Sequence, residues 1–123
     1  QSSGGNEPHN QSIQKVLLAK GKDFDSKKGE LFNTMSALDA AGMGTYKYHD
    51  DWNMLDQIII SGALTDGQGW DYQEESASIF SPEWLKQQSP EKYKGSPLRT
   101  FGGSKYLGGY SDHFPIYIHL STK

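Results

Sequence analysis

The pattern most typical of a β-strand in this chain extends from Asn53 to Ser61. Successive side chains of an extended strand point to opposite faces, and in this segment both faces carry apolar residues. Strands of this kind are typically central in a sheet and covered on both sides. We therefore predict a central strand over residues 53–61, in which Asp56 is a single carboxylate among apolar neighbours.

Helical spacing of apolar residues occurs in two segments that precede this strand. The first predicts a helix over residues 10–20, and the second predicts a helix over residues 30–41 that Gly42 would end. A third helix is predicted to begin at Ser81–Pro82, because serine is a favoured N-cap and proline suits the first helical position.

Shorter apolar segments predict further strands over residues 45–48, 77–80 and 114–120, and the pair Trp70 and Tyr72 is a further candidate start. Residues 89–111 are rich in glycine and proline and are predicted to form a long ordered loop. This order of elements favours an α/β fold with a mixed or antiparallel sheet and helices on one face.

Composition limits the chain to a single domain of 123 residues. Its hydrophobic fraction of 34% and mean hydropathy of -0.74 indicate a lean core, although the chain is more apolar than a disordered one. The net charge of -3 provides no global attraction to nucleic acid, but it leaves room for a local basic cleft.

The absence of cysteine excludes disulfides and thiolate metal sites. No apolar run approaches the roughly 20 residues of a membrane helix. Residues 1–8 are expected to be a flexible leader or a cloning remnant.

Candidate chemistry begins with the adjacent pair Asp112 and His113, just before the predicted strand over residues 114–120. A carboxylate beside an imidazole can bind a metal ion with one group and move a proton with the other. Asp56 is the second candidate, because a carboxylate on an apolar strand costs several kcal/mol unless it is paired. The alternative interpretation is a loop-capping aspartate and a surface histidine.

These segments resemble the C-terminal half of the endonuclease/exonuclease/phosphatase superfamily of metal-dependent phosphoesterases. Residues 111–115 are similar to its last motif, which is Ser-Asp-His, an apolar residue and Pro, and Asp56 is similar to the strand aspartate of its penultimate motif. Three further segments look like a mainly bacterial branch of that superfamily: Gly44–Tyr48, Trp52–Ile59 and Pro97–Phe101. The resemblance covers roughly residues 6–121.

The resemblance implies that residues 9–123 are half of a four-layer α/β sandwich, which an N-terminal half or a second copy would complete. It also implies hydrolysis of a phosphodiester or phosphomonoester by water, with Mg²⁺ or Mn²⁺ as cofactor. In that scheme His113 acts as general base or stabilises the phosphate, Asp56 orients His113, and Asp112 binds the metal. The family's glutamate ligand does not occur at a matching position, and Gly5-Asn6-Glu7-Pro8 stands where the family carries Gly-Asp-x-Asn. The chain alone is therefore expected to be inactive and to bind metal weakly.

Two further residues are candidates for substrate binding. Arg99 lies in a glycine-rich loop, where a guanidinium either forks onto phosphate oxygens or forms a surface ion pair. Asn53 precedes the predicted central strand, where it either hydrogen-bonds the substrate or caps the turn.

Two rival functions remain open at this point. One is a binding or structural module that keeps the fold without catalysis. The other is an unrelated hydrolase built on Ser111, Asp112 and His113, which is disfavoured because adjacent residues on an extended segment alternate in direction and do not form a triad among themselves.

The expected partners are a phosphate ester of unspecified class and a second copy of the chain. An uncovered sheet face predicts a homodimer, because soluble monomers seldom expose large apolar patches. Relatives of the bacterial branch often carry a secretion signal, so the resemblance also implies a periplasmic or secreted location.

Overall fold

The structure of the chain is a computed structural model, and it describes residues 13, 15 and 18–122. The helix predicted over residues 10–20 therefore falls largely outside the described residues. Of its described residues, Ile13 and Lys15 are π-helical, whereas Ala19–Lys20 forms the first strand, β1, so the prediction is wrong at the end of that segment.

One three-stranded sheet combines parallel and antiparallel pairing, as the sequence predicts. Its order is β1-β2-β5, with β2 at Leu31–Asn33 and β5 at Ile59–Ser61. β1 pairs with β2 in parallel, and β2 pairs with β5 in antiparallel register through Phe32 and Ile60. β5 lies at the edge of this sheet, so the prediction of a central strand is wrong.

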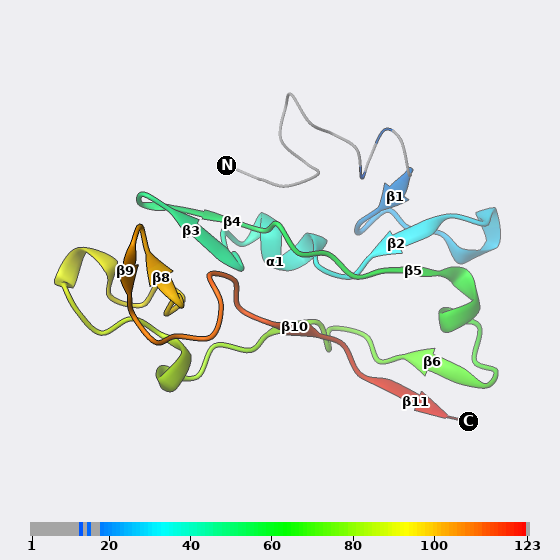
Figure 1. Cartoon of the computed structure of the whole chain (residues 1–123). Coiled ribbons are helices and arrows are strands. Elements are labelled where there is room, and N and C mark those ends of the chain that lie inside the picture. Colours follow the sequence, from blue (N-terminus) through cyan, green and yellow to red (C-terminus); the bar gives the residue numbers. More distant parts are fainter. Residues whose placement is uncertain (1–12, 14, 16–17, 123) are drawn as a thin grey trace.

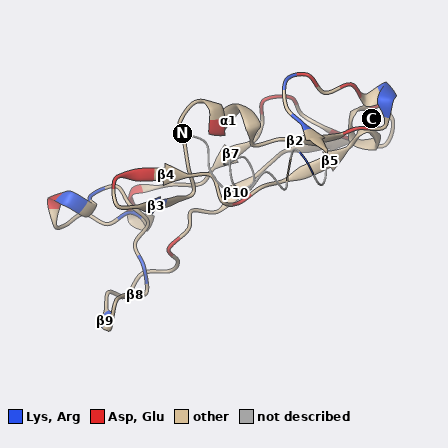
Figure 2. Cartoon of the chain, turned by 90° about the horizontal axis from the view of Figure 1, so that it is seen from above, with Lys and Arg blue, Asp and Glu red and all other residues tan. Residues whose placement is uncertain are grey.

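The remaining strands form four antiparallel pairs. These pairs are β3 (Tyr46–Tyr48) with β4 (Asp51–Asn53), β6 (Trp70–Tyr72) with β11 (Leu120–Thr122), β7 (Ser78–Ile79) with β10 (Ile116–Tyr117), and β8 (Phe101–Gly102) with β9 (Lys105–Tyr106). Figure 1 shows an elongated arrangement, with β3, β4, β8 and β9 at one end and β2, β5, β6 and β11 at the other. Acidic and basic residues occur at both ends (Figure 2).

Helices contribute less than the sequence predicts. In the described part of the chain the one α-helix is α1, Ser36–Ala40, and the first residues of the helix predicted over 30–41 belong instead to β2. The helix predicted at Ser81–Pro82 is a single 3₁₀ turn, Glu83–Leu85, because the chain becomes extended again at Lys86 and pairs with Pro97. Further 3₁₀ turns lie at Ser26–Lys28, Gly62–Thr65 and Glu91–Tyr93.

The segment between β4 and β5 departs from strand geometry at Met54. The Gln57 side chain donates a hydrogen bond to the Met54 carbonyl at 2.6 Å, and the Ile58 carbonyl accepts from both the backbone and the hydroxyl of Thr34. Leu55 in this segment is exposed, whereas Met54 and Ile60 are buried. One face of the segment is therefore buried, where the sequence predicts two.

The described chain is a small α/β fold with mixed and antiparallel sheets and few helices. Residues 89–111, predicted as a loop, include the β8–β9 hairpin, in which Gly103 has a φ of 62° that disfavours other residues. The four-layer sandwich and its completion by a second copy stay predictions. No helix of the described residues is long and apolar enough to cross a membrane.

The buried apolar core of the described chain is small, and it joins elements that are distant in sequence. Its members are Ala19, Met35, Met54, Ile60, Leu85 and Phe114. Since few residues supply this packing, each should contribute strongly to stability.

We expect Met54→Ala to lower the free energy of unfolding by about 2–5 kcal/mol, because it would leave a cavity at a side chain with 0% exposure. Urea unfolding followed by circular dichroism measures the change. Met43, which is 45% exposed, provides the matched control, and Met43→Ala should have little effect. Equal loss in both variants would contradict the packing described here.

Candidate active site

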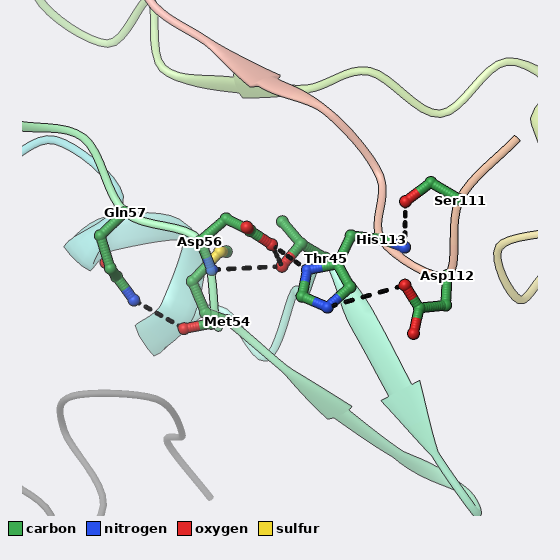
Figure 3. A network of polar contacts seen from close by, with 7 residues as sticks. All are labelled: Thr45, Met54, Asp56, Gln57, Ser111, Asp112 and His113. Atoms are coloured by element: carbon green, nitrogen blue, oxygen red, sulfur yellow. Dashed lines mark hydrogen bonds and ion pairs between the residues drawn. The ribbon is translucent and has the colours of Figure 1, made fainter.

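The central contact of the candidate site joins Asp56 and His113. Asp56 Oδ2 lies 2.6 Å from His113 Nδ1 (Figure 3). Asp56 belongs to the segment between β4 and β5, and His113 precedes β10, so the fold brings together residues 57 positions apart in sequence. An ionised carboxylate at this distance accepts the Nδ1 proton, which leaves the lone pair of a neutral imidazole on Nε2.

Thr45 fixes the carboxylate of this pair. Its side chain is fully buried, and its hydroxyl donates a hydrogen bond of 2.6 Å to Asp56 Oδ2, the same oxygen that faces His113. The Asp56 backbone N–H donates weakly to the Thr45 hydroxyl at 3.4 Å. One hydroxyl therefore restrains both the backbone and the carboxylate of Asp56.

The backbone of Thr45 also holds the segment that carries the histidine. Its carbonyl accepts a hydrogen bond of 2.8 Å from the N–H of Phe114, the residue after His113, and its own N–H donates to the Asn53 carbonyl. Phe114 is buried and stacks on Trp52 of β4, with ring centroids 5.9 Å apart. The imidazole is thus attached to the β3–β4 hairpin by backbone bonding and by aromatic packing.

Gly44 allows this close approach of β3 to β4. A Cβ atom at position 44 would lie 2.7 Å from the backbone nitrogen of Asn53, a separation that real Cβ atoms do not adopt. Any larger residue at this position would push apart the two strands that align Thr45.

The other edge of the imidazole faces Asp112 and solvent. Asp112 Oδ1 lies 4.0 Å from His113 Nε2, which is too long for a hydrogen bond. The Tyr46 ring contacts the imidazole with centroids 5.2 Å apart. The Ser111 hydroxyl accepts a hydrogen bond from the His113 backbone N–H, so Ser111 shapes the loop and does not contact the ring through this bond.

Partial exposure of the pair corrects one expectation. The Asp56 and His113 side chains are 38% and 34% exposed, so Asp56 is not a fully buried carboxylate on a central strand. The desolvation cost that would demand a partner is correspondingly smaller. A shallow depression of about 200 Å³ opens beside the pair, with walls from Asp56, Ser111, His113, Phe114, Pro115 and Ile116.

Metal binding needs more ligands than the described residues bring together. No group of three histidine, cysteine, aspartate or glutamate residues in this part of the chain is placed to hold a metal ion. The Asp112 side chain is 52% exposed and offers one carboxylate, whereas Mg²⁺ prefers six oxygen ligands. The described residues therefore do not fit a self-contained metal site.

The two candidate substrate-binding residues, Arg99 and Asn53, both lie beside Tyr46, whose ring contacts His113. The Arg99 guanidinium lies 5.8 Å from the centre of the Tyr46 ring, and within the described chain Arg99 forms no ion pair. Asn53 is directly opposite Tyr46 in the β3–β4 ladder, so the two side chains share a face. The Asn53 amide reaches the Asp51 carbonyl at 3.4 Å, which matches its alternative role in the turn.

Sequence reasoning did not single out Thr45 or assign Tyr46 a particular contact. Both lie in the segment Gly44–Tyr48, which resembles the family, and that similarity was the available signal. Their contacts with Asp56 and His113 depend on pairing between distant segments, which one sequence does not specify.

Asp56→Asn should disturb the tautomer of His113, because an amide can offer either an acceptor or a donor to Nδ1. We expect the single Nδ1–H form to be replaced by a mixture, visible as a change in the ¹⁵N chemical shifts of both ring nitrogens. His49, which is exposed on the β3–β4 turn, serves as an internal control and should not change. Unaltered His113 shifts in the variant would contradict the contact.

Comparison with known proteins places the chain in a family. A family model described as the endonuclease/exonuclease/phosphatase family matches residues 4–122. A search of curated proteins and a search of solved structures each give no match. Because the family model spans nearly the whole chain, the chain belongs to the endonuclease/exonuclease/phosphatase family.

Proposed function

We propose that the domain formed with this chain hydrolyses a phosphate ester, either a diester or a monoester, by attack of an activated water molecule. Members of the family are generally hydrolases of this phosphoesterase and nuclease-like class. The observation that carries the proposal is the 2.6 Å contact between Asp56 Oδ2 and His113 Nδ1. It is the geometry of an acid–base dyad, in which a carboxylate orients an imidazole.

His113 is the proton-handling group in this proposal. With its Nδ1 proton directed to Asp56, the Nε2 atom faces away from the dyad and can accept a proton from an attacking water molecule. In its protonated form the same atom would stabilise negative charge on the phosphate. Its 34% exposure supports either role, because solvent and substrate can reach the ring.

Asp56 and Thr45 are positioning residues in this proposal. The Thr45 hydroxyl directs one carboxylate oxygen toward Nδ1, and the carboxylate then sets the orientation of the imidazole. A positioned general base typically contributes a factor of about 10²–10⁴ to the rate. Most of this factor would be lost if the ring could rotate or change tautomer.

The proposal includes Mg²⁺ or Mn²⁺ in the complete site, with Asp112 as one oxygen ligand. Such an ion neutralises charge on a phosphoryl oxygen and lowers the pKa of bound water. The other ligands would have to come from outside the described residues or from the substrate phosphate. We therefore propose that the 123 residues alone turn over substrate poorly, if at all.

Arg99 and Asn53 are proposed to bind the substrate phosphate. A guanidinium without an ion-pair partner in the described chain is available to a phosphate, and its planar fork matches two oxygens. Asn53 could add a single amide donor from the face that it shares with Tyr46.

A non-catalytic binding or structural module is the second candidate function. It is favoured by one observation, which is the lack of a three-ligand metal group among the described residues. In that case the Asp56–His113 contact would serve the fold alone. Enzyme assay separates the two candidates.

We expect the complete gene product to hydrolyse bis-p-nitrophenyl phosphate or p-nitrophenyl phosphate when Mg²⁺ or Mn²⁺ is supplied. His113→Ala should lower kcat by about 10²–10⁴-fold, because the proton-handling group is removed. His119→Ala provides the matched control, because His119 is exposed and lies outside the depression beside the dyad.

Three results would count against parts of this scheme. Equal activity of wild type and His113→Ala would exclude the dyad as catalytic. Rapid turnover by the 123-residue chain alone would exclude the proposed need for further ligands. Complete inactivity of every form with both metals would favour the binding module.

The proposal also assigns a partner, which is a second copy of the chain. Phe80, Trp84 and Tyr110 form a chain of edge-to-face contacts with centroid distances of 6.1 and 5.6 Å, and all three are well exposed. Such an aromatic surface favours association, and a two-fold dimer would bury the same patch on both copies.

Light scattering at micromolar concentration should therefore give the mass of a dimer. Trp84→Ser is expected to shift the equilibrium toward monomer, because aromatic anchors dominate interface energies. Trp70→Ser is the control, since Trp70 is 58% exposed but lies on β6, outside this aromatic cluster. A monomer at high concentration, or an equal effect of the two variants, would exclude this interface.

A further inference from the structure

A cavity of about 460 Å³ lies beside the dyad and is distinct from the smaller depression that contains His113. Its walls come from the β3–β4 hairpin, the β8–β9 hairpin and the segment 87–99 that connects β7 to β8. The β8–β9 hairpin projects away from the rest of the chain (Figure 2). The volume is in the range of small-molecule sites, which are about 300–1,000 Å³.

The charged residues in the wall of this cavity are all basic. Lys47, Arg99 and Lys105 contribute to it, and no aspartate or glutamate does. Lys47 lies over the Trp52 ring at 5.6 Å, whereas Arg99 and Lys105 form no ion pair in the described part of the chain. In a chain with a net charge of -3, this local excess of positive charge favours an anionic ligand.

Three tyrosines supply the ring surfaces of the same cavity. Tyr46 and Tyr48 come from β3, and Tyr93 comes from the 3₁₀ turn Glu91–Tyr93. Tyr48 and Tyr93 are 58% and 45% exposed, so their rings are accessible. Tyrosine faces stack on flat unsaturated rings and give little selectivity among them.

Tyr46 connects this cavity to the dyad. Its ring lines the cavity, contacts the His113 ring at 5.2 Å and lies 5.8 Å from the Arg99 guanidinium. A substrate with its reacting phosphate at His113 could therefore extend past Tyr46 into the cavity. The cavity then receives the part of the substrate that does not react.

A second cavity of the fold has the opposite electrostatic character. It has a volume of about 680 Å³, and its walls include Asp25, Glu74 and Glu75 but only one basic residue, Lys22. An anion would be repelled there. The two cavities thus provide an internal comparison within one chain.

We infer that the Tyr46–Arg99–Lys105 cavity binds an anionic ligand through its flat unsaturated ring, and that this ring is the non-reacting part of the substrate. This inference rests on the proposed phosphoesterase function and specifies its substrate class. An aryl phosphate and a nucleotide both carry this chemistry. A saturated sugar phosphate fits less well, because the cavity has no carboxylate to accept hydrogen bonds from its hydroxyls.

Calorimetric titration of the His113→Ala chain tests the inference without turnover. The probes are phenyl phosphate, adenosine monophosphate, glucose 6-phosphate and inorganic phosphate. We expect phenyl phosphate or adenosine monophosphate to bind about tenfold more tightly than glucose 6-phosphate and inorganic phosphate, because only a ring-bearing probe can stack on the tyrosines. Binding of phenyl phosphate or of the nucleotide then identifies the source of the ring.

Variants on two sides of the cavity locate the binding. Lys105→Gln and Tyr93→Leu should each weaken the preferred probe by about tenfold, because one removes a charged contact and the other a stacking surface. Lys22→Gln, in the other cavity, should leave the affinity unchanged. Circular dichroism confirms that each variant folds.

The outcomes separate this inference from the proposed function. Selective binding that the cavity variants weaken supports the inference even if the complete protein hydrolyses nothing. Hydrolysis by the complete protein with unaltered KM in Lys105→Gln and Tyr93→Leu overturns the inference and leaves the phosphoesterase proposal standing. Failure of every probe to bind, equal affinity for all four, or an equal effect of Lys22→Gln also overturns it.

Discussion

The hydrogen bonds of Thr45 are the constraint on which the candidate site depends. Its hydroxyl binds the Asp56 carboxylate, its carbonyl binds the backbone of Phe114, and its N–H binds Asn53. Three segments of the chain therefore meet at one fully buried residue. Asp56 and His113 belong to two separate connecting segments, and the Thr45 hydrogen bonds join these segments. The local sequence around each residue does not by itself bring the two side chains to 2.6 Å.

This arrangement explains how a fold with short strands and a small core can still define a rigid pair of side chains. Met54 is buried two residues before Asp56, and Phe114 is buried directly after His113. Each side chain of the pair therefore lies within two residues of a packed residue that holds its backbone, while the side chain itself remains about one-third exposed. Packing holds the backbone in place and exposure keeps the imidazole accessible, which is the balance that the proposed proton transfer would require.

The sequence predicts the central contact of this site better than the fold around it. The Asp56–His113 contact follows from motif similarity, and the strand over residues 46–48 follows from local pattern. Residues 31–33 show helical spacing yet form β2, because pairing with β1 and β5 outweighs the local preference. The segment 53–61 is not one continuous strand: it pairs with β3 through Asn53 and with β2 through Ile59–Ser61, and Gln57 bonds the Met54 carbonyl between them. The strand at residues 31–33 and the break within residues 53–61 both depend on pairing with segments elsewhere in the chain, and so do the contacts of Thr45. The periodicity of a single segment contains no information about such pairing.

The β3–β4 hairpin is the element that connects the site to its proposed specificity. Thr45 fixes the dyad, and the next residue, Tyr46, contacts His113 on one side and the basic cavity on the other. Gly44 brings β3 against β4 closely enough to place both residues. A shift of this hairpin would move the imidazole support and the cavity wall together, so substrate binding at Tyr46 and orientation of His113 should be energetically coupled. That coupling would favour catalysis for ligands that fill the cavity, because binding energy from a remote ring would help to hold the proton-transfer geometry.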